Sequence, residues 1–315
     1  MAPPELRALG ASGIEVSALS LGSWRTFEWI SREAGVAVMS AARESGITFL
    51  DDARYDDETG VAPIPTGYSE VVFGELFRAA RWKRDEVVVA NKLWWEFWPE
   101  QTAAQELDAS LGRMGFDYLD FAYSAKPPEG VSVREVVVAT GALVASGKLR
   151  AWGVLNWPAE LVAEAAHVAA EEGLPSPCAA QLPYSIACTE YVEDAAMRAA
   201  LGEAGAGVVA SFALAGGALT GKYASEGATG RLAAERDEPG WKDELEAGER
   251  LRSLAGEMDA TPAQLALAFA LANDHVSSVL FGVTSPEQVV ENVGAAEVSA
   301  RLSDGDLAVL RHVGD

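Results

Sequence analysis

The sequence predicts a (β/α)8 barrel, in which eight parallel strands close on themselves and helices cover the outside. Short apolar, β-branched runs alternate with amphipathic helical stretches, and this alternation is typical of a parallel sheet covered by helices. The runs number eight, which favours closure into a barrel over an open sheet. With 315 residues, of which 49% are hydrophobic, the chain is long enough to form one barrel domain over residues 1–315.

The predicted elements follow one another in a regular order. The hydrophobic pattern predicts strands at Val16–Leu21, Thr48–Asp51, Glu86–Lys92, Tyr118–Tyr123, Ala151–Leu155, Ala179–Leu182, Val208–Phe212 and Val276–Phe281. Helical periodicity is clear over Gln101–Arg113, Arg134–Ser146 and Ala159–Glu172. Leu6–Val16 contains a Gly-Ala-Ser-Gly turn, so we expect an N-terminal β-hairpin that closes the barrel floor. We expect a long polar loop at Ala224–Glu244 and an extra C-terminal helix at Ser303–Val313.

The composition of the chain argues against several kinds of binding partner and against a metal site. The net charge of -23 argues against binding to nucleic acid or to anionic membranes. Two Cys are too few for a disulfide framework, and the start, Met1–Glu5, lacks the basic and apolar regions of a signal peptide. No apolar run is long enough to span a bilayer. We therefore expect a cytoplasmic protein, and with only three His we expect no metal site.

Polar side chains stand at the predicted carboxyl ends of several strands. Asp51, Lys92, Asn156 and Gln181 all occupy such positions, and active sites of (β/α)8 barrels lie on this face. An Asp and a Lys in a poorly solvated pocket can form an ion pair that lowers the pKa of a neighbouring Tyr hydroxyl. A Tyr tuned in this way is an acid that is usable near neutral pH. The alternative is an ion pair with a purely structural role.

The order and spacing of several motifs resemble the aldo-keto reductases. Asp51–Glu70 is similar to the family's Asp-Thr-Ala-x-x-Tyr…Ser-Glu signature, and Gly22-Ser23-Trp24 to its Gly-Thr-Trp. Gly216–Tyr223 resembles its Gly-x-Leu-Thr-Gly-Lys-Tyr segment, and Gly282–Asn292 its C-terminal motif on the adenine side of the cofactor. The resemblance covers nearly the whole chain. It implies a barrel that binds NADP(H) or NAD(H) and acts on a small carbonyl or alcohol substrate.

The chain departs from the family at two catalytic positions. The family's proton-donating Tyr follows the Asp by five residues, where this chain has Asp56, while Tyr55 lies one position earlier. The loop after Tyr55 is longer than is common in the family. It either shifts the register so that Tyr55 reaches the donor position, or leaves Asp56 there. The family's His position is Ala125, which can neither orient a carbonyl group nor relay a proton.

The resemblance also implies which residues contact the cofactor. These are Ser23, Trp24, Asn156, Gln181, Ser211, Phe212, Leu214, Gly216, Leu219, Gly221, Lys222, Arg231, Gly282, Thr284, Gln288, Glu291 and Asn292. Thr284 replaces an Arg that binds the 2′-phosphate in many members, which weakens the expected preference for NADPH. Lys222 and Arg231 are candidates to hold the pyrophosphate; for Arg231 the alternative is a solvated loop charge.

Aromatic residues on the predicted barrel-top loops are candidates for the substrate pocket. Trp24, Trp94 and Trp95 would form an apolar pocket that accepts rings, or would pack loops onto helices. Tyr123, at the end of a predicted strand beside Ala125, is a further candidate to contact the substrate, through a rebuilt hydrogen bond. With Asp51, Tyr55 and Lys92 as catalytic residues, the predicted function is hydride transfer between NAD(P)H and an aldehyde or ketone. The alternative is a relative without reductase activity that binds a dinucleotide as a sensor or partner protein, or that catalyses a lyase or epimerase step. Oligomeric state is left open.

Overall fold

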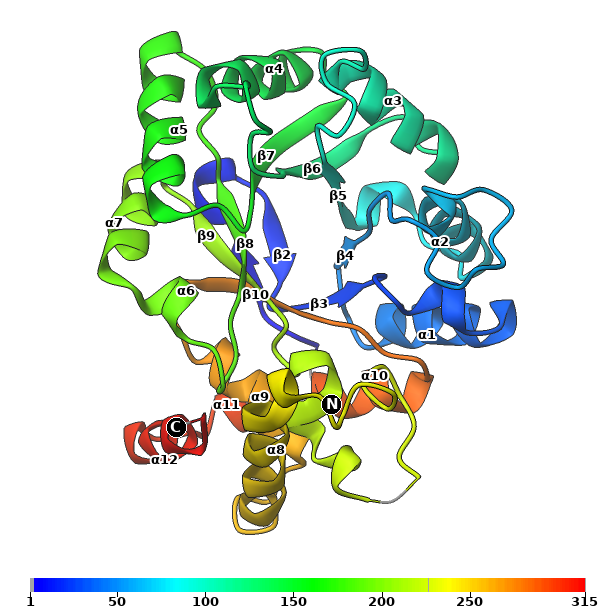
Figure 1. The fold of residues 1–315 in the computed structure, drawn as a ribbon, viewed down its shortest axis with the longest axis vertical. Helices are drawn as coiled ribbons and strands as arrows, with labels where there is room; N and C mark the ends of the chain where they lie inside the picture. Colours follow the sequence, from blue (N-terminus) through cyan, green and yellow to red (C-terminus); the bar gives the residue numbers. More distant parts are fainter. Residues whose placement is uncertain (1–2, 226, 315) are drawn as a thin grey trace.

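Eight parallel strands close into a barrel in the computed structural model, which describes residues 3–225 and 227–314 (Figure 1). The strands are β3 (Leu19–Gly22), β4 (Phe49–Asp51), β5 (Val88–Leu93), β6 (Leu119–Ser124), β7 (Leu149–Leu155), β8 (Ala179–Pro183), β9 (Gly207–Ser211) and β10 (Val276–Phe281). Each strand pairs with the next in the chain, and β10 closes the ring by pairing with both β9 and β3. The predicted fold class is confirmed.

Helices surround the barrel (Figure 1). They are α1 (Arg32–Glu44), α2 (Tyr68–Ala79), α3 (Ala103–Met114), α4 (Val133–Ala145), α5 (Ala159–Glu172), α6 (Glu190–Glu193), α7 (Ala195–Ala204), α8 (Lys242–Ala255), α9 (Pro262–Leu271), α10 (Pro286–Val293), α11 (Ala295–Ser299) and α12 (Asp304–Gly314). Capping residues determine where several of them begin. Thr102 and Gln105 form a capping box, so α3 begins at Ala103 and not at the predicted Gln101. The predicted C-terminal helix is α12.

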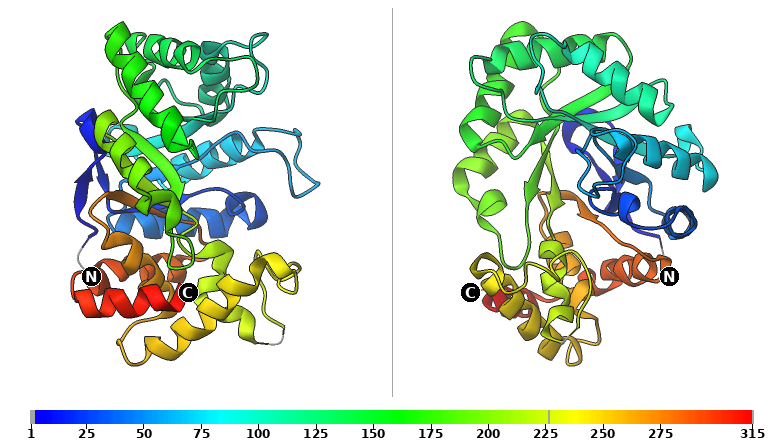
Figure 2. Two further views of the ribbon diagram at one scale, coloured as in Figure 1. Left: turned by 60° about the vertical axis from the view of Figure 1, so that its left-hand side comes forward. Right: turned by 45° about the vertical axis from the view of Figure 1, so that its right-hand side comes forward.

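The N-terminal hairpin closes one end of the barrel. Its strands are β1 (Leu6–Ala8) and β2 (Glu15–Ser17), with the 3-10 helix η1 (Gly10–Ser12) between them. Leu9, Ile14 and Val16 pack inside the barrel with the strand residues Phe49 and Phe121. The side view in Figure 2 (left) shows the hairpin at the end opposite the long connecting loops. This arrangement confirms the expected hairpin at the barrel floor.

Two predicted segments differ from the structure. The predicted strand Val16–Leu21 is divided at Ala18, because Ser17 pairs with Leu6 in the hairpin whereas Leu19 pairs with Val279 in the barrel. The predicted loop Ala224–Glu244 is shorter than expected. Its last part forms the 3-10 helix η6 (Pro239–Trp241) and the first turn of α8. Residue 226 of this loop, and Met1 and Ala2 of the segment inspected for a signal peptide, lie outside the described residues.

The connections after the strands are longest at the end of the barrel away from the hairpin. The segment 56–66, called the arm below, projects beside α2 in Figure 2 (left), on the same side as the segments leading into α8. The remaining 3-10 helices are η2 (Phe27–Trp29), η3 (Arg84–Glu86), η4 (Ala215–Thr220) and η5 (Lys222–Ala224). Within residues 3–225 and 227–314, no helix combines the length and apolar character needed to cross a bilayer.

Candidate active site

A buried ion pair lies at the carboxyl ends of neighbouring strands. Asp51 is the last residue of β4, and its Oδ1 lies 2.6 Å from Nζ of Lys92 in β5. Gln181 of β8 donates from Nε2 to the other oxygen of Asp51 across 3.1 Å. All three side chains are buried. The structure therefore brings these three predicted site residues together in one hydrogen-bonded group.

The hydroxyl group of Tyr55 completes this group. Lys92 Nζ donates to the Tyr55 hydroxyl across 3.1 Å. The backbone of Tyr55 is held on both sides, because its N–H donates to Ser69 Oγ (3.2 Å) and its carbonyl accepts from the Gly67 N–H (2.7 Å). Asp56 is exposed and forms a β-bridge with Thr66 across the base of the arm. The phenol thus lies at the ion pair, while the Asp56 side chain lies at the surface.

The charges in the group have opposing effects on Tyr55. Burial raises the pKa of Tyr55, and the opposing effect of the Lys92 charge does not cancel this increase. The expectation that the ion pair gives Tyr55 a lowered pKa was therefore wrong, because desolvation outweighs the charge. Burial alone would lower the pKa of Lys92, but Asp51 and Tyr55 outweigh it and raise that pKa. At neutral pH the site holds a protonated phenol beside a charged ammonium group.

The arm is fastened to the mouth of the barrel by side chains. Arg25 forms an ion pair with Glu58, and Arg54 donates to Thr66 Oγ1 across 2.8 Å. Within the arm, the Asp57 carboxylate accepts from the N–H groups of Thr59, Gly60 and Ala62. These bonds give the arm a defined shape although it projects from the barrel. Since its base holds Tyr55, the arm supports the position of the phenol.

Trp24 is enclosed by two guanidinium groups at the mouth. The Arg231 guanidinium lies 4.7 Å from the centre of the indole ring, and that of Arg25 lies 5.2 Å from it. Arg231 also donates to the Trp24 carbonyl across 2.7 Å. The ring centre of Phe212 lies 5.6 Å from that of Trp24, and the ring of Tyr55 lies 6.4 Å away. Phe212 is 44% exposed, so part of this residue is accessible at the mouth of the barrel.

The other predicted substrate residues differ in access. Trp94 is partly exposed, and its ring lies edge-on to Tyr55 with 6.4 Å between the ring centres. Trp95 is fully buried and donates from Nε1 to Ser124 Oγ across 2.8 Å. Tyr123 is also fully buried, inside the barrel. Trp24 and Trp94 therefore offer surface to a substrate in this conformation, whereas Trp95 and Tyr123 do not.

Two cations lie near η4 and η5, at the positions expected to meet a cofactor. Within the described part of the chain, neither Lys222 nor Arg231 forms an ion pair with a carboxylate, although the protein is strongly acidic. Burial, followed by the charge of the neighbouring Arg25, lowers the pKa of Arg231, although the charge of Glu58 acts in the opposite direction. Gly216 and Gly217 have positive φ angles of 65° and 97° beside these cations. The donor set therefore fits an anionic group.

The remaining cofactor candidates fall into two groups. Asn156, Ser211, Leu214, Gly282, Thr284, Gln288 and Glu291 are exposed or partly exposed. Thr284 donates from its N–H to Gln288 Oε1 across 2.8 Å, just before the start of α10. Leu219 is fully buried in the core, Asn292 is buried, and a Cβ on Gly221 would lie 2.8 Å from the Gly248 carbonyl oxygen in α8. Leu219 and Gly221 thus pack the segment against its neighbours.

Ser23, another residue predicted to contact the cofactor, already has a hydrogen-bond partner within the protein. The Ser23 hydroxyl donates to Oδ1 of Asp52, a fully buried side chain. Burial, followed by the charge of Glu70, raises the pKa of Asp52 well above its ordinary value. Asp52 thus lies buried under the mouth of the barrel, at the position where the family signature has Thr, in surroundings that favour its protonated form.

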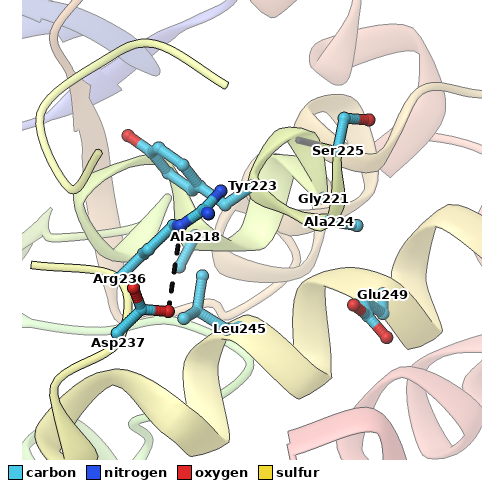
Figure 3. Close-up of a pocket in the computed structure, with 9 residues that line it drawn as sticks. All are labelled: Ala218, Gly221, Tyr223, Ala224, Ser225, Arg236, Asp237, Leu245 and Glu249. Atoms are coloured by element: carbon cyan, nitrogen blue, oxygen red, sulfur yellow. Dashed lines mark ion pairs between the residues drawn. The ribbon is translucent and has the colours of Figure 1, made fainter. Parts of the chain in front are cut away.

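A separate cavity lies beside α8. It has a volume of about 280 Å³, and Figure 3 shows it between η5, α8 and an ion pair between Arg236 and Asp237. Gly221 is the single predicted site residue in its lining. The cavity is therefore distinct from the ion pair at the mouth. Among the described residues, no group of three or more His, Cys, Asp or Glu side chains is placed to hold a metal ion.

Sequence reasoning missed two residues that support the site. Glu106 of α3 is buried and accepts the N–H groups of Trp94 (2.8 Å) and Trp95 (3.3 Å), which fixes the loop after β5. Its signal is available in the sequence, since Glu106 occupies the apolar face of α3 one position before Leu107. Ser69, which holds Tyr55, belongs to the quoted Ser-Glu motif, but its partner could not be read from the pattern.

Together the fold and the site define a (β/α)8-barrel protein with a phenol hydroxyl hydrogen-bonded to a buried Asp–Lys pair at the carboxyl ends of its strands. The model of the aldo/keto reductase family matches residues 18–315. The chain belongs to this family, which confirms the resemblance seen in its motifs.

Two curated relatives are similar along nearly their whole length. A probable voltage-gated potassium channel subunit beta from Oryza sativa subsp. japonica is 31% identical over 309 residues, covering 93% of this chain and 92% of the relative. A putative voltage-gated potassium channel subunit beta from Schizosaccharomyces pombe (strain 972 / ATCC 24843) is 32% identical over 317 residues, covering 94% and 89%. These similarities support the family and do not indicate a substrate.

Proposed function

We propose that this protein transfers hydride between a nicotinamide cofactor, NADPH or NADH, and an aldehyde or ketone. The observation that carries the proposal is the Tyr55 hydroxyl, 3.1 Å from Lys92 Nζ and next to the buried Asp51. Its raised pKa keeps the phenol protonated at neutral pH, as a proton donor to a carbonyl oxygen requires.

Each residue of the group has a separate task in carbonyl reduction. A bound nicotinamide supplies the hydride. Tyr55 gives its proton to the carbonyl oxygen as negative charge develops there. Lys92 stays cationic and stabilises the phenolate that remains, while Asp51 holds Lys92 in place and Gln181 fixes the second carboxylate oxygen. For cofactor binding, Lys222 and Arg231 would meet the pyrophosphate.

The first test compares Tyr55→Phe with Asp56→Ala. Turnover of NADPH or NADH with a panel of aldehydes and ketones should fall by roughly 10²- to 10⁴-fold in Tyr55→Phe, as expected on loss of a general acid. The dissociation constant of the cofactor, measured by fluorescence quenching, should change little because the acid acts in the transition state. Asp56→Ala is the matched control, and it should retain activity because Asp56 is exposed. The reverse pattern would mean that Asp56 is the donor.

The second candidate is a dinucleotide-binding partner subunit without reductase turnover. Two observations favour it: Ala125 stands at the family's His position, and both relatives carry the name of potassium channel beta subunits. Such a protein would bind NADPH or NADH at micromolar concentration, yet the bound cofactor would not be oxidised in a single turnover with any carbonyl of the panel. Oxidation with one of them excludes this alternative.

A further inference from the structure

Glu28 has a carboxyl oxygen that is shielded from solvent and lacks a hydrogen-bond partner. The residue lies in η2, on the connection from β3 to α1, and its Oε1 has no partner among the described residues. Burying an ionised carboxylate without a donor or a counter-charge is costly, whereas burying a neutral carboxylic acid costs much less. The surroundings of this oxygen therefore favour a proton on Glu28.

The charges near Glu28 act mostly against its ionisation. The arm supplies Asp57 and Glu58, and α1 supplies Arg32. Burial, followed by the charges of Asp57 and Glu58, raises the pKa of Glu28 from its ordinary value of 4.5 to about 7. The charge of Arg32 acts in the opposite direction and does not cancel this increase.

The cations beside this side chain are engaged with other groups. Arg32 forms an ion pair with Glu75 (3.1 Å) and donates to the Tyr68 hydroxyl (2.9 Å), and both partners belong to α2, which packs against η2. Arg25 forms the ion pair with Glu58 that fastens the arm. Within residues 3–225 and 227–314, neither guanidinium group forms an ion pair with a carboxylate of η2. A negative charge that develops in η2 thus finds both cations occupied.

The arm is joined to the barrel at few points, and one of them lies next to η2. Two side-chain contacts fasten it to the mouth, the Arg25–Glu58 ion pair and the Arg54–Thr66 hydrogen bond. Val61 of the arm is 85% exposed, so the far part of the arm gains little from packing. An electrostatic change at the Arg25–Glu58 contact therefore acts on a segment that is weakly held.

We propose that Glu28 is a pH-dependent switch that keeps the arm fastened while it is protonated and loosens the arm when it is ionised. Ionisation releases one proton to solvent and places a third negative charge near Asp57 and Glu58. Loosening the arm separates these charges and returns the pKa of Glu28 toward its ordinary value. Since the pKa is raised in the fastened state, fastening is strongest below about pH 4.5, weakens as the pH rises, and is weakest above about pH 7. This inference concerns the arm alone and goes beyond the proposed reductase function.

The test follows the δ1-methyl signal of Ile64, in the arm, by ¹³C NMR from about pH 5 to about pH 8. Ile64→Val identifies the signal. In the unaltered protein the signal should move toward its position in a flexible chain, with a midpoint between pH 4.5 and about pH 7. The ratio of fastened to loosened arm should fall by roughly 10- to 100-fold, which is less than tenfold per pH unit because solvent screens the half-buried Glu28.

Two variants identify the titrating group. Glu28→Gln is neutral at every pH, so its Ile64 signal should stay at the position seen at low pH. Glu44→Gln is the matched control, because Glu44 is exposed at the far end of α1, and this variant should titrate like the unaltered protein. A titration of Ile64 that persists in Glu28→Gln overturns the inference, and so does an Ile64 signal that does not change with pH in the unaltered protein.

Asp52 is the competing candidate, because it is fully buried and its pKa is raised well above its ordinary value. Asp52→Asn should leave the titration of Ile64 in place, and loss of the titration in this variant overturns the inference. Should Glu28→Gln fail to fold, Asp52→Asn is measured again in 1 M NaCl, where a Debye length of about 3 Å screens the repulsion among the carboxylates. A midpoint that falls in salt supports the switch, and an unchanged midpoint overturns it. No cofactor or carbonyl compound enters this experiment, so its outcome is independent of the reductase proposal.

Discussion

Asp51, Asp52 and Glu70 are three of the buried carboxyl groups near β4 and β5, and each has a different partner. Asp51 is paired with Lys92, and Glu70 is paired with Arg113. Asp52 has the Ser23 hydroxyl and no cation within ion-pair distance among the described residues. The first two groups each have a cationic partner, while burial of the third without one favours its protonated form.

This difference predicts that Asp52→Asn stabilises the protein in a pH-dependent manner. An unfolded Asp titrates near pH 4, and the pKa of Asp52 is raised well above that value in the folded protein. A raised pKa contributes stability that is present below about pH 4 and is lost as the pH rises. Asp52→Asn lacks this loss, and its amide oxygen can still accept from Ser23.

The measurement is thermal or urea unfolding of both proteins at pH 4 and pH 8. The gain in unfolding free energy should be larger at pH 8 than at pH 4. Glu164→Gln on the exposed face of α5 serves as the control for removal of one negative charge. A gain that is the same at both pH values would show that Asp52 is ionised in the folded protein.

From the sequence, site residues could be placed only where they lie at the carboxyl ends of predicted strands. Asp51, Lys92 and Gln181 could be placed together because carboxyl ends of parallel strands meet on one face. The position of Tyr55 could not, because it depends on bonds to Ser69 and Gly67 that close a long loop. Its pKa was misjudged because the degree of burial of a side chain cannot be derived from its neighbours in sequence.

At the scale of elements, helices α2 and α3 are packed in close contact through a glycine. A Cβ at Gly74 of α2 would collide with the Met114 carbonyl oxygen at the end of α3. Gly112 in α3 is the contrasting case, since a Cβ there would meet no atom within 4 Å. The two glycines thus differ in surroundings although both lie within helices.

We expect Gly74→Ala to destabilise the protein by about 1–3 kcal/mol, because overpacking forces the two helices apart. Gly112→Ala should stabilise it by about 0.5–1 kcal/mol, since Ala loses less conformational entropy in a helix. Urea unfolding with comparison of midpoints and m-values measures both. Equal effects of the two substitutions would contradict the packing described for α2 and α3.

The elements themselves were largely predictable, and their junctions were not. Helix α5 covers the predicted range Ala159–Glu172 because periodicity continues up to Gly173, whose left-handed conformation ends the helix. The corner at Ala18 was missed because the chain keeps an extended, apolar pattern on both sides of it. The hydrophobic pattern predicts an extended conformation, but it does not show that the chain pairs with β1 before Ala18 and with β10 after it.

At the scale of the whole molecule, the charge of -23 is carried by a barrel whose ion pairs are mostly at the surface. Screening should therefore stabilise the protein. The melting temperature should rise when NaCl is increased from 0.01 M to 1 M, because the Debye length falls from about 30 Å to about 3 Å. Sucrose at equal osmolality is the control for excluded-solute effects. A falling melting temperature would mean that attractive pairs outweigh the repulsion.

The closure of the barrel has a consequence for how the protein is made. β3 is among the first strands to leave the ribosome, yet its partner on one side is β10, where Leu19 pairs with Val279. Until β10 emerges, β3 and β9 both present unpaired edges, and exposed edges favour association between chains. The last strand, β10, therefore covers both unpaired edges at the same time. A chain that stops before Val276 would contain seven of the eight barrel strands and would still be prone to aggregation.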